Sequence, residues 1–129
     1  KAAIAYYSRH HGNTKKLLDA IRELGDIKLI DWLCIRHILQ QFSGKVVEFA
    51  RKNLPAGKRV FLINTYGVKG DYTREMRRII EEKSCRLVGT YGCRGFDTFG
   101  PFKLIGGLAK GHPDENDIKG AVEFFRSIT

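Results

Sequence analysis

The feature that most constrains the fold of this chain is a regular alternation between short apolar runs and segments with helical spacing of apolar residues. Residues 2–7 form an uninterrupted apolar run, which is typical of a strand buried on both faces of a parallel sheet. Residues 60–63 form a second such run. Because parallel strands are joined by crossover connections, usually helices, the alternation predicts an α/β fold with right-handed crossovers.

The remaining elements follow from the same two periodicities. Strands are predicted at residues 27–31, 59–64 and 86–91, and residues 92–111 are predicted to form a glycine-rich loop. The first helix is expected to end at Gly25 in a left-handed C-cap. The inward faces of the four predicted helices are marked by Leu17, Leu18, Ile21 and Leu24, by Leu39, Phe42, Val46, Phe49 and Ala50, by Met76, Ile79 and Ile80, and by Ile118, Val122, Phe125 and Ile128.

Composition limits the class of protein and its surroundings. A chain of 129 residues with 43% hydrophobic residues is expected to fold as a single domain, residues 1–129. Its longest apolar runs are far shorter than the roughly 20 residues of a membrane-spanning helix. Cys34, Cys85 and Cys93 form no CxxC pair, so neither a disulfide framework nor a structural metal is predicted, and a reducing cytoplasm fits best. The net charge of +9 favours anionic partners.

The turn after the first strand contains the groups that bind a phosphate. Backbone N–H groups at a helix N-terminus, hydroxyls and positive charge converge where a strand enters a helix through such a turn. The same turn is also compatible with an ordinary strand-to-helix connection in which Asn13 or Thr14 is the N-cap. It is neither a Walker A loop nor a GxGxxG motif. The candidate phosphate-binding residues are Ser8, Arg9, His10, His11, Gly12, Asn13 and Thr14.

Residues 6–16 resemble the phosphate loop of the flavodoxins, small electron carriers that bind FMN, and in particular a subgroup with a His-His-Gly-Asn-Thr loop. Thr65, Tyr66 and Gly67 stand where that family has a flavin-contacting loop. The resemblance implies a flavodoxin-like three-layer α/β/α sandwich with a parallel sheet in the order 2-1-3-4-5. It also implies FMN as the cofactor, with Tyr66 preferred over Trp32 as the residue that stacks on the flavin ring.

The chain departs from the flavodoxin plan after residue 31. Only residues 32–38 separate the second predicted strand from the next helix, so about 20 residues are missing relative to normal element and connection lengths. The third strand is therefore either truncated in the chain or omitted from the sequence. Flavodoxins are usually acidic, whereas this chain is strongly basic.

Three functions are compatible with these features. The first is an FMN-binding electron-transfer protein that acts on redox partner proteins and has no catalytic residues of its own. The second is an FMN-dependent NAD(P)H:quinone or flavin reductase, and the third is a flavin-free α/β binding module. The basic residues are mixed with acidic ones, as in residues 74–83, which argues against a nucleic-acid surface.

Overall fold

The computed structural model describes residues 2–6, 11–31, 44–67, 70–71, 73–96 and 104–129. Strands and helices alternate along these residues, as the sequence predicts. In chain order the elements are β1 (Ala2–Tyr6), α1 (Asn13–Arg22), β2 (Ile27–Asp31), α2 (Gly44–Asn53), β3 (Arg59–Tyr66), α3 (Arg74–Glu82), β4 (Arg86–Arg94) and α4 (Glu115–Ile128).

The described strands pair in two parallel sets. β1 lies beside β2, with register from Ala2↔Ile27 to Tyr6↔Asp31, and β3 lies beside β4, ending at the pair Tyr66↔Arg94. An irregularity between Val60 and Phe61 shifts the β3–β4 register by one residue. The predicted α/β class with parallel strands is confirmed. Residues 32–43, where the third strand is predicted to be truncated, lie outside the described residues.

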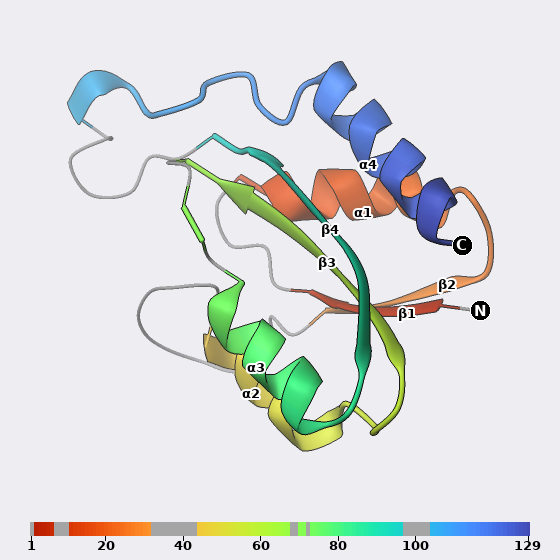
Figure 1. Cartoon of the computed structure of the whole chain (residues 1–129). Coiled ribbons are helices and arrows are strands. Elements are labelled where there is room, and N and C mark those ends of the chain that lie inside the picture. Colours follow the sequence, from red (N-terminus) through yellow and green to blue (C-terminus); the bar gives the residue numbers. More distant parts are fainter. Residues whose placement is uncertain (1, 7–10, 32–43, 68–69, 72, 97–103) are drawn as a thin grey trace.

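Helices cover both faces of the β3–β4 pair (Figure 1). α1 and α4 lie on one face, and α2 and α3 lie on the other. The first core cluster, between α1, α4 and the strands, includes the fully buried Leu17 and Ile21. The second core cluster joins α2, α3 and β3 around Leu62 and Ile79. The amphipathic helices therefore bury apolar stripes against the strands. In α2 the core residues include Val46, Val47 and Ala50, whereas the predicted Phe49 is not part of the cluster.

Several predicted boundaries are confirmed and others are corrected. The second strand begins and ends where it is predicted, and the inward residues of α3 and α4 contact the core. α1 ends at Arg22 with Glu23 as its C-cap, so the prediction of a left-handed cap at Gly25 is wrong. β3 continues through Tyr66 and β4 through Arg94, because each strand supplies the backbone partners of the other. Residues 92–94 are thus strand and not loop.

Candidate functional site

Three segments lie together at the carboxyl ends of the strands. We call this group of residues, 11–14, 65–67 and 95–96, the loop cluster. Thr14 Oγ1 lies 3.0 Å from Thr65 Oγ1, and Asn13 Nδ2 donates to the carbonyl of Phe96 at 2.8 Å. The backbone N–H of Gly95 donates to the carbonyl of Tyr66 at 2.9 Å. In parallel α/β sheets, ligands bind at this edge of the sheet.

The start of α1 is open toward the loop cluster. His11 and Gly12 both have left-handed backbone conformations, with φ of 54° and 65°. Gly12 is the N-cap, so the alternative in which Asn13 or Thr14 caps the helix is corrected. Among the residues that the structure describes, no side chain caps the helix, and its first turn contains no acidic residue. The N–H groups of the first turn and the positive end of the helix dipole are therefore free of an intrinsic carboxylate partner.

Asn13 is locked into the loop cluster by its neighbours. Its side chain is only 6% exposed, and its Oδ1 is buried without a hydrogen-bond partner. A Cβ atom placed on Gly95 would lie 2.7 Å from Asn13 Nδ2, so the backbone of Gly95 packs directly against the amide. An unpaired buried acceptor costs about 1–3 kcal/mol, which a donor group on a ligand or a water would offset.

The structure places seven of the ten predicted site residues. Ser8, Arg9 and His10 lie outside the described residues. Thr14 and Thr65 come together, and the exposed ring of His11 lies 4.3 Å from the ring of Phe96. Tyr66 belongs to β3 and its side chain lies on the face of the sheet opposite Thr65, because side chains alternate along a strand.

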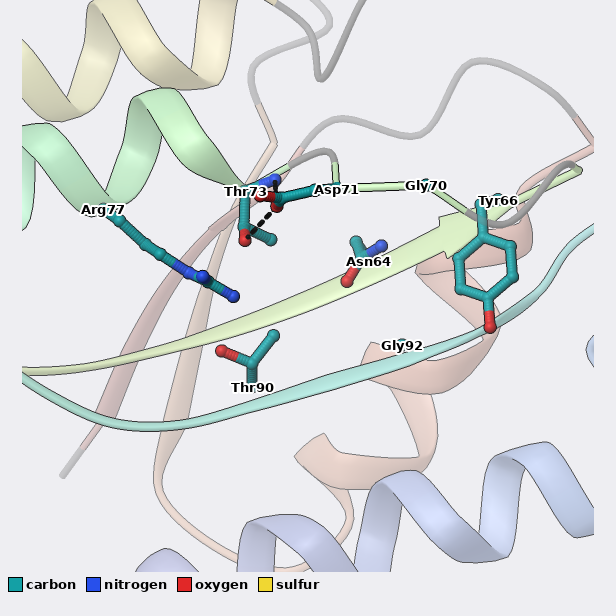
Figure 2. Close-up of a pocket in the computed structure, with 8 residues that line it drawn as sticks. All are labelled: Asn64, Tyr66, Gly70, Asp71, Thr73, Arg77, Thr90 and Gly92. Carbon is teal, nitrogen blue, oxygen red and sulfur yellow. Dashed lines mark hydrogen bonds between the residues drawn. The ribbon is translucent and has the colours of Figure 1, made fainter.

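The side chain of Tyr66 borders a pocket of about 400 Å³ on the side of α3 (Figure 2). We call this cavity the α3-side pocket. Sequence reasoning did not single it out, although Asn64 is a polar residue at the end of an apolar run, which is a usable signal. Its walls are formed by Asn64, Tyr66, Asp71, Thr73, Arg77 and Thr90, together with Gly70 and Gly92.

A cluster of polar groups at the start of α4 has a structural role. Asp114 and Asp117 form a capping box, in which each side chain accepts from the backbone N–H of the other at 2.9 Å. Nδ1 of His112 lies 2.6 Å from Asp117 Oδ2. These three residues hold potential metal ligands within 4.8 Å of one another. Their hydrogen bonds to one another and to the backbone are those of a helix cap.

Cys93 faces the first core cluster and has the properties of a packing residue. Burial, followed by the nearby Asp117 and Asp114 carboxylates, raises the pKa of the Cys93 thiol to about 12. The thiolate is the reactive form of cysteine. Cys93 is therefore best described as a buried packing thiol.

The fold and the loop cluster define an α/β protein with parallel strands and a convergence of loops at the strand ends. No protein-family model matches the chain. It is 35% identical over 147 residues to the uncharacterized protein MJ0298 of Methanocaldococcus jannaschii, an alignment that covers 99% of this chain and 97% of the relative. The chain belongs to the same family as this archaeal protein.

The alignment is longer than the chain itself. It extends over 147 positions, whereas the chain has 129 residues, so the relative has at least 18 positions at which this chain has no residue. None of the helices that the structure describes is both long and apolar enough to span a bilayer.

Proposed function

We propose that this protein is a flavodoxin-like FMN-binding protein that transfers electrons between redox partner proteins in the cytoplasm. The observation that supports the proposal is the contact between Thr14 and Thr65, whose Oγ1 atoms lie 3.0 Å apart. It brings the proposed phosphate loop and the proposed flavin loop to one point at the carboxyl ends of the strands. Open α/β sheets bind their ligands at this edge, beyond the carboxyl ends of the strands.

The residues at the start of α1 fit the phosphate of FMN. The helix has an uncapped N-terminus and no acidic residue in its first turn, so a dianion there meets backbone N–H groups without carboxylate repulsion. Within the described part of the chain, no heavy atom beyond its chain neighbours lies within 4 Å of a Cβ atom placed on Gly12, which leaves space among these residues for an approaching group. The hydroxyl of Thr14 adds a donor beside these amides.

The arrangement of the elements supports the flavodoxin-like part of the proposal. The pairs β1–β2 and β3–β4 correspond to the neighbours 2-1 and 4-5 in the order 2-1-3-4-5. The extra positions of the archaeal relative, at least 18, are close in number to the roughly 20 residues of the third strand and its loop, which are either truncated in this chain or omitted from the sequence. When bound, FMN supplies the redox chemistry, while the protein holds its phosphate and orients its ring.

The proposal is tested by adding FMN and riboflavin separately to the purified protein and following flavin fluorescence. We expect quenching by the protein, and we expect Thr14→Val to weaken FMN about tenfold while riboflavin binding changes little, because only FMN carries the phosphate. Thr90→Val, on the opposite face of the sheet, is the matched control. If the flavin fluoresces as free flavin at saturating protein, the proposal is refuted. If Thr14→Val lowers the affinities for FMN and riboflavin equally, the phosphate does not bind at Thr14.

A turnover assay separates an electron carrier from a reductase. FMN-loaded protein is mixed with NAD(P)H and a quinone, and oxidation of the nicotinamide is followed. We expect flavin reduction by dithionite but no sustained turnover. Continuous oxidation of NAD(P)H would identify the protein as an FMN-dependent reductase instead.

A further inference from the structure

Because side chains alternate along β3, the α3-side pocket lies on the opposite face of the sheet from the Thr14–Thr65 contact, and Tyr66 belongs both to the loop cluster and to the pocket wall. Thr65 points to the face of α1, where it meets Thr14, while Asn64 and Tyr66 point to the face of α3 (Figure 2). Across the sheet, Thr90 and Gly92 of β4 line the same pocket. The pocket thus lies on the opposite face of the sheet from the proposed phosphate site.

Asn64 is a buried polar group aimed into this pocket. The residue as a whole is 8% exposed, and its side-chain amide forms no hydrogen bond with the residues that the structure describes. A Cβ atom placed on Gly92 would lie 3.0 Å from Asn64 Oδ1, so the glycine gives the amide its room. The amide atoms of Asn64 are not fully buried, so they face the space of the pocket and are available to a group that enters it.

Two opposite charges share the pocket with this amide. Asp71 Oδ1 accepts from the backbone N–H of Thr73 at 3.2 Å and from its hydroxyl at 3.1 Å. These two hydrogen bonds, and then the charges of Arg77 and Arg74, hold the pKa of Asp71 below its ordinary value. The guanidinium of Arg77 also lines the pocket, yet within the described part of the chain the two groups form no ion pair.

We propose that the α3-side pocket binds a small zwitterion, of which an α-amino acid is the simplest example. The carboxylate of the ligand would meet Arg77 and the Thr90 hydroxyl, and its ammonium group would meet Asp71 and the amide oxygen of Asn64. A simple anion would be repelled by Asp71, and a simple cation by Arg77. The volume of about 400 Å³ lies within the range of small-molecule sites.

The test is a titration of the ¹⁵N-labelled protein with the standard amino acids, each separately at millimolar concentration, followed by amide chemical shifts. We expect at least one amino acid to shift the signals of Asn64, Thr90 and Gly92. For that amino acid, the corresponding carboxylic acid without the amino group and the corresponding amine without the carboxylate are expected to bind about tenfold more weakly, because each lacks one charge-assisted contact.

Matched variants locate the site. Arg77→Gln is expected to weaken the amino acid about tenfold, whereas Arg78→Gln, which removes the same charge from an exposed neighbour outside the pocket, is expected to leave it unchanged. Thr90→Val is expected to weaken it as well and to leave FMN binding unaffected. Thr14→Val is expected to weaken FMN binding and to leave the binding of the amino acid unaffected.

The outcomes separate this proposal from the proposed FMN function. If FMN fails to bind but an amino acid still shifts the pocket signals, the pocket proposal stands alone. Absence of shifts with every amino acid, equal binding of the carboxylic acid, or insensitivity to Arg77→Gln would overturn it. Competitive displacement by FMN would also overturn it, because the pocket would then belong to the flavin site.

Discussion

The hydroxyl oxygens of Thr14 and Thr65 lie 3.0 Å apart, although 51 positions separate the two residues in the chain. Thr14 is in the first turn of α1 and Thr65 is near the end of β3. This contact ties the start of the first helix to the end of a strand from the other half of the chain. The stability of the loop cluster should therefore depend on both hydroxyls.

Thr14→Val and Thr65→Val are each expected to lower the free energy of unfolding by about 1 kcal/mol, because each removes one partner of a partly buried hydrogen bond. The double variant should lose less than the sum of the two, since the second substitution removes a hydroxyl that has already lost its partner. Urea unfolding of the four proteins measures this coupling. Strictly additive losses would show that the two hydroxyls do not interact in solution.

Gly95→Ala is expected to destabilise the protein by about 1–3 kcal/mol, as overpacking does in a closed site. The added methyl carbon would lie 2.7 Å from Asn13 Nδ2 and 3.0 Å from Asn13 Cγ. Asn13→Ala removes the obstructing amide, so adding Gly95→Ala to that variant should cost much less. Thermal unfolding of the single and double variants tests this, and an equal cost in both backgrounds would contradict the close packing.

Asp114→Ala is expected to cost about 1 kcal/mol of unfolding free energy, because Asp114 Oδ1 accepts from the backbone N–H of Asp117 at the start of α4. Asn116→Ala, at an exposed position of the same helix turn, is the control and should change stability little. Chemical denaturation of both variants measures the difference. Equal effects would argue against the capping box.

Acidic pH is expected to lower the free energy of unfolding, because Asp117 at the start of α4 becomes protonated. Burial alone would raise the pKa of Asp117, but hydrogen bonds from the Asp114 N–H and from His112, with the charge of His112, outweigh burial and lower it from 3.8. A carboxylate whose pKa is lower in the folded state stabilises fully above its unfolded pKa, and this stabilisation is lost as pH falls through the folded pKa. Unfolding free energies below pH 4 should therefore fall less steeply in Asp117→Asn than in the natural protein.

Cys93 is expected to resist thiol reagents in the folded protein. Its pKa of about 12 leaves almost no thiolate at neutral pH, and its side chain is buried. Maleimide labelling followed by peptide mass analysis should modify Cys85, which is partly exposed, well before Cys93. Urea should abolish the difference. Rapid labelling of Cys93 in the native state would show that the first core cluster opens readily.

Much of the fold was predictable because it depends on local patterns. The apolar runs, the helical spacing and the acidic start of α4 are each patterns that can be seen within a few neighbouring residues. The ends of β3 and β4 were not predictable in this way. Gly92 is a poor strand residue by propensity, yet it lies in β4 because Asn64 of β3 is its register partner.

The residues of the candidate site also differ in whether the local sequence could reveal them. Gly12, Asn13 and Thr14 could be selected from the sequence because the chemistry of a strand-to-helix turn is local. Phe96 and Gly95 could not, because their roles arise from contacts with Asn13 over distances of more than 80 residues in the chain. Asn64 was recognisable only as a polar end to an apolar run.

The sequence by itself determined the α/β class, the parallel strands and the position of the turn that precedes α1, since periodicity and turn chemistry are properties of neighbouring residues. Only the tertiary structure decided which face each strand residue occupies. The register shift between Val60 and Phe61 adds one residue to β4, and a shift of one residue exchanges the two faces of a strand. That register directs Cys93 into the core beside α1 and α4, and Thr90 and Gly92 into the α3-side pocket.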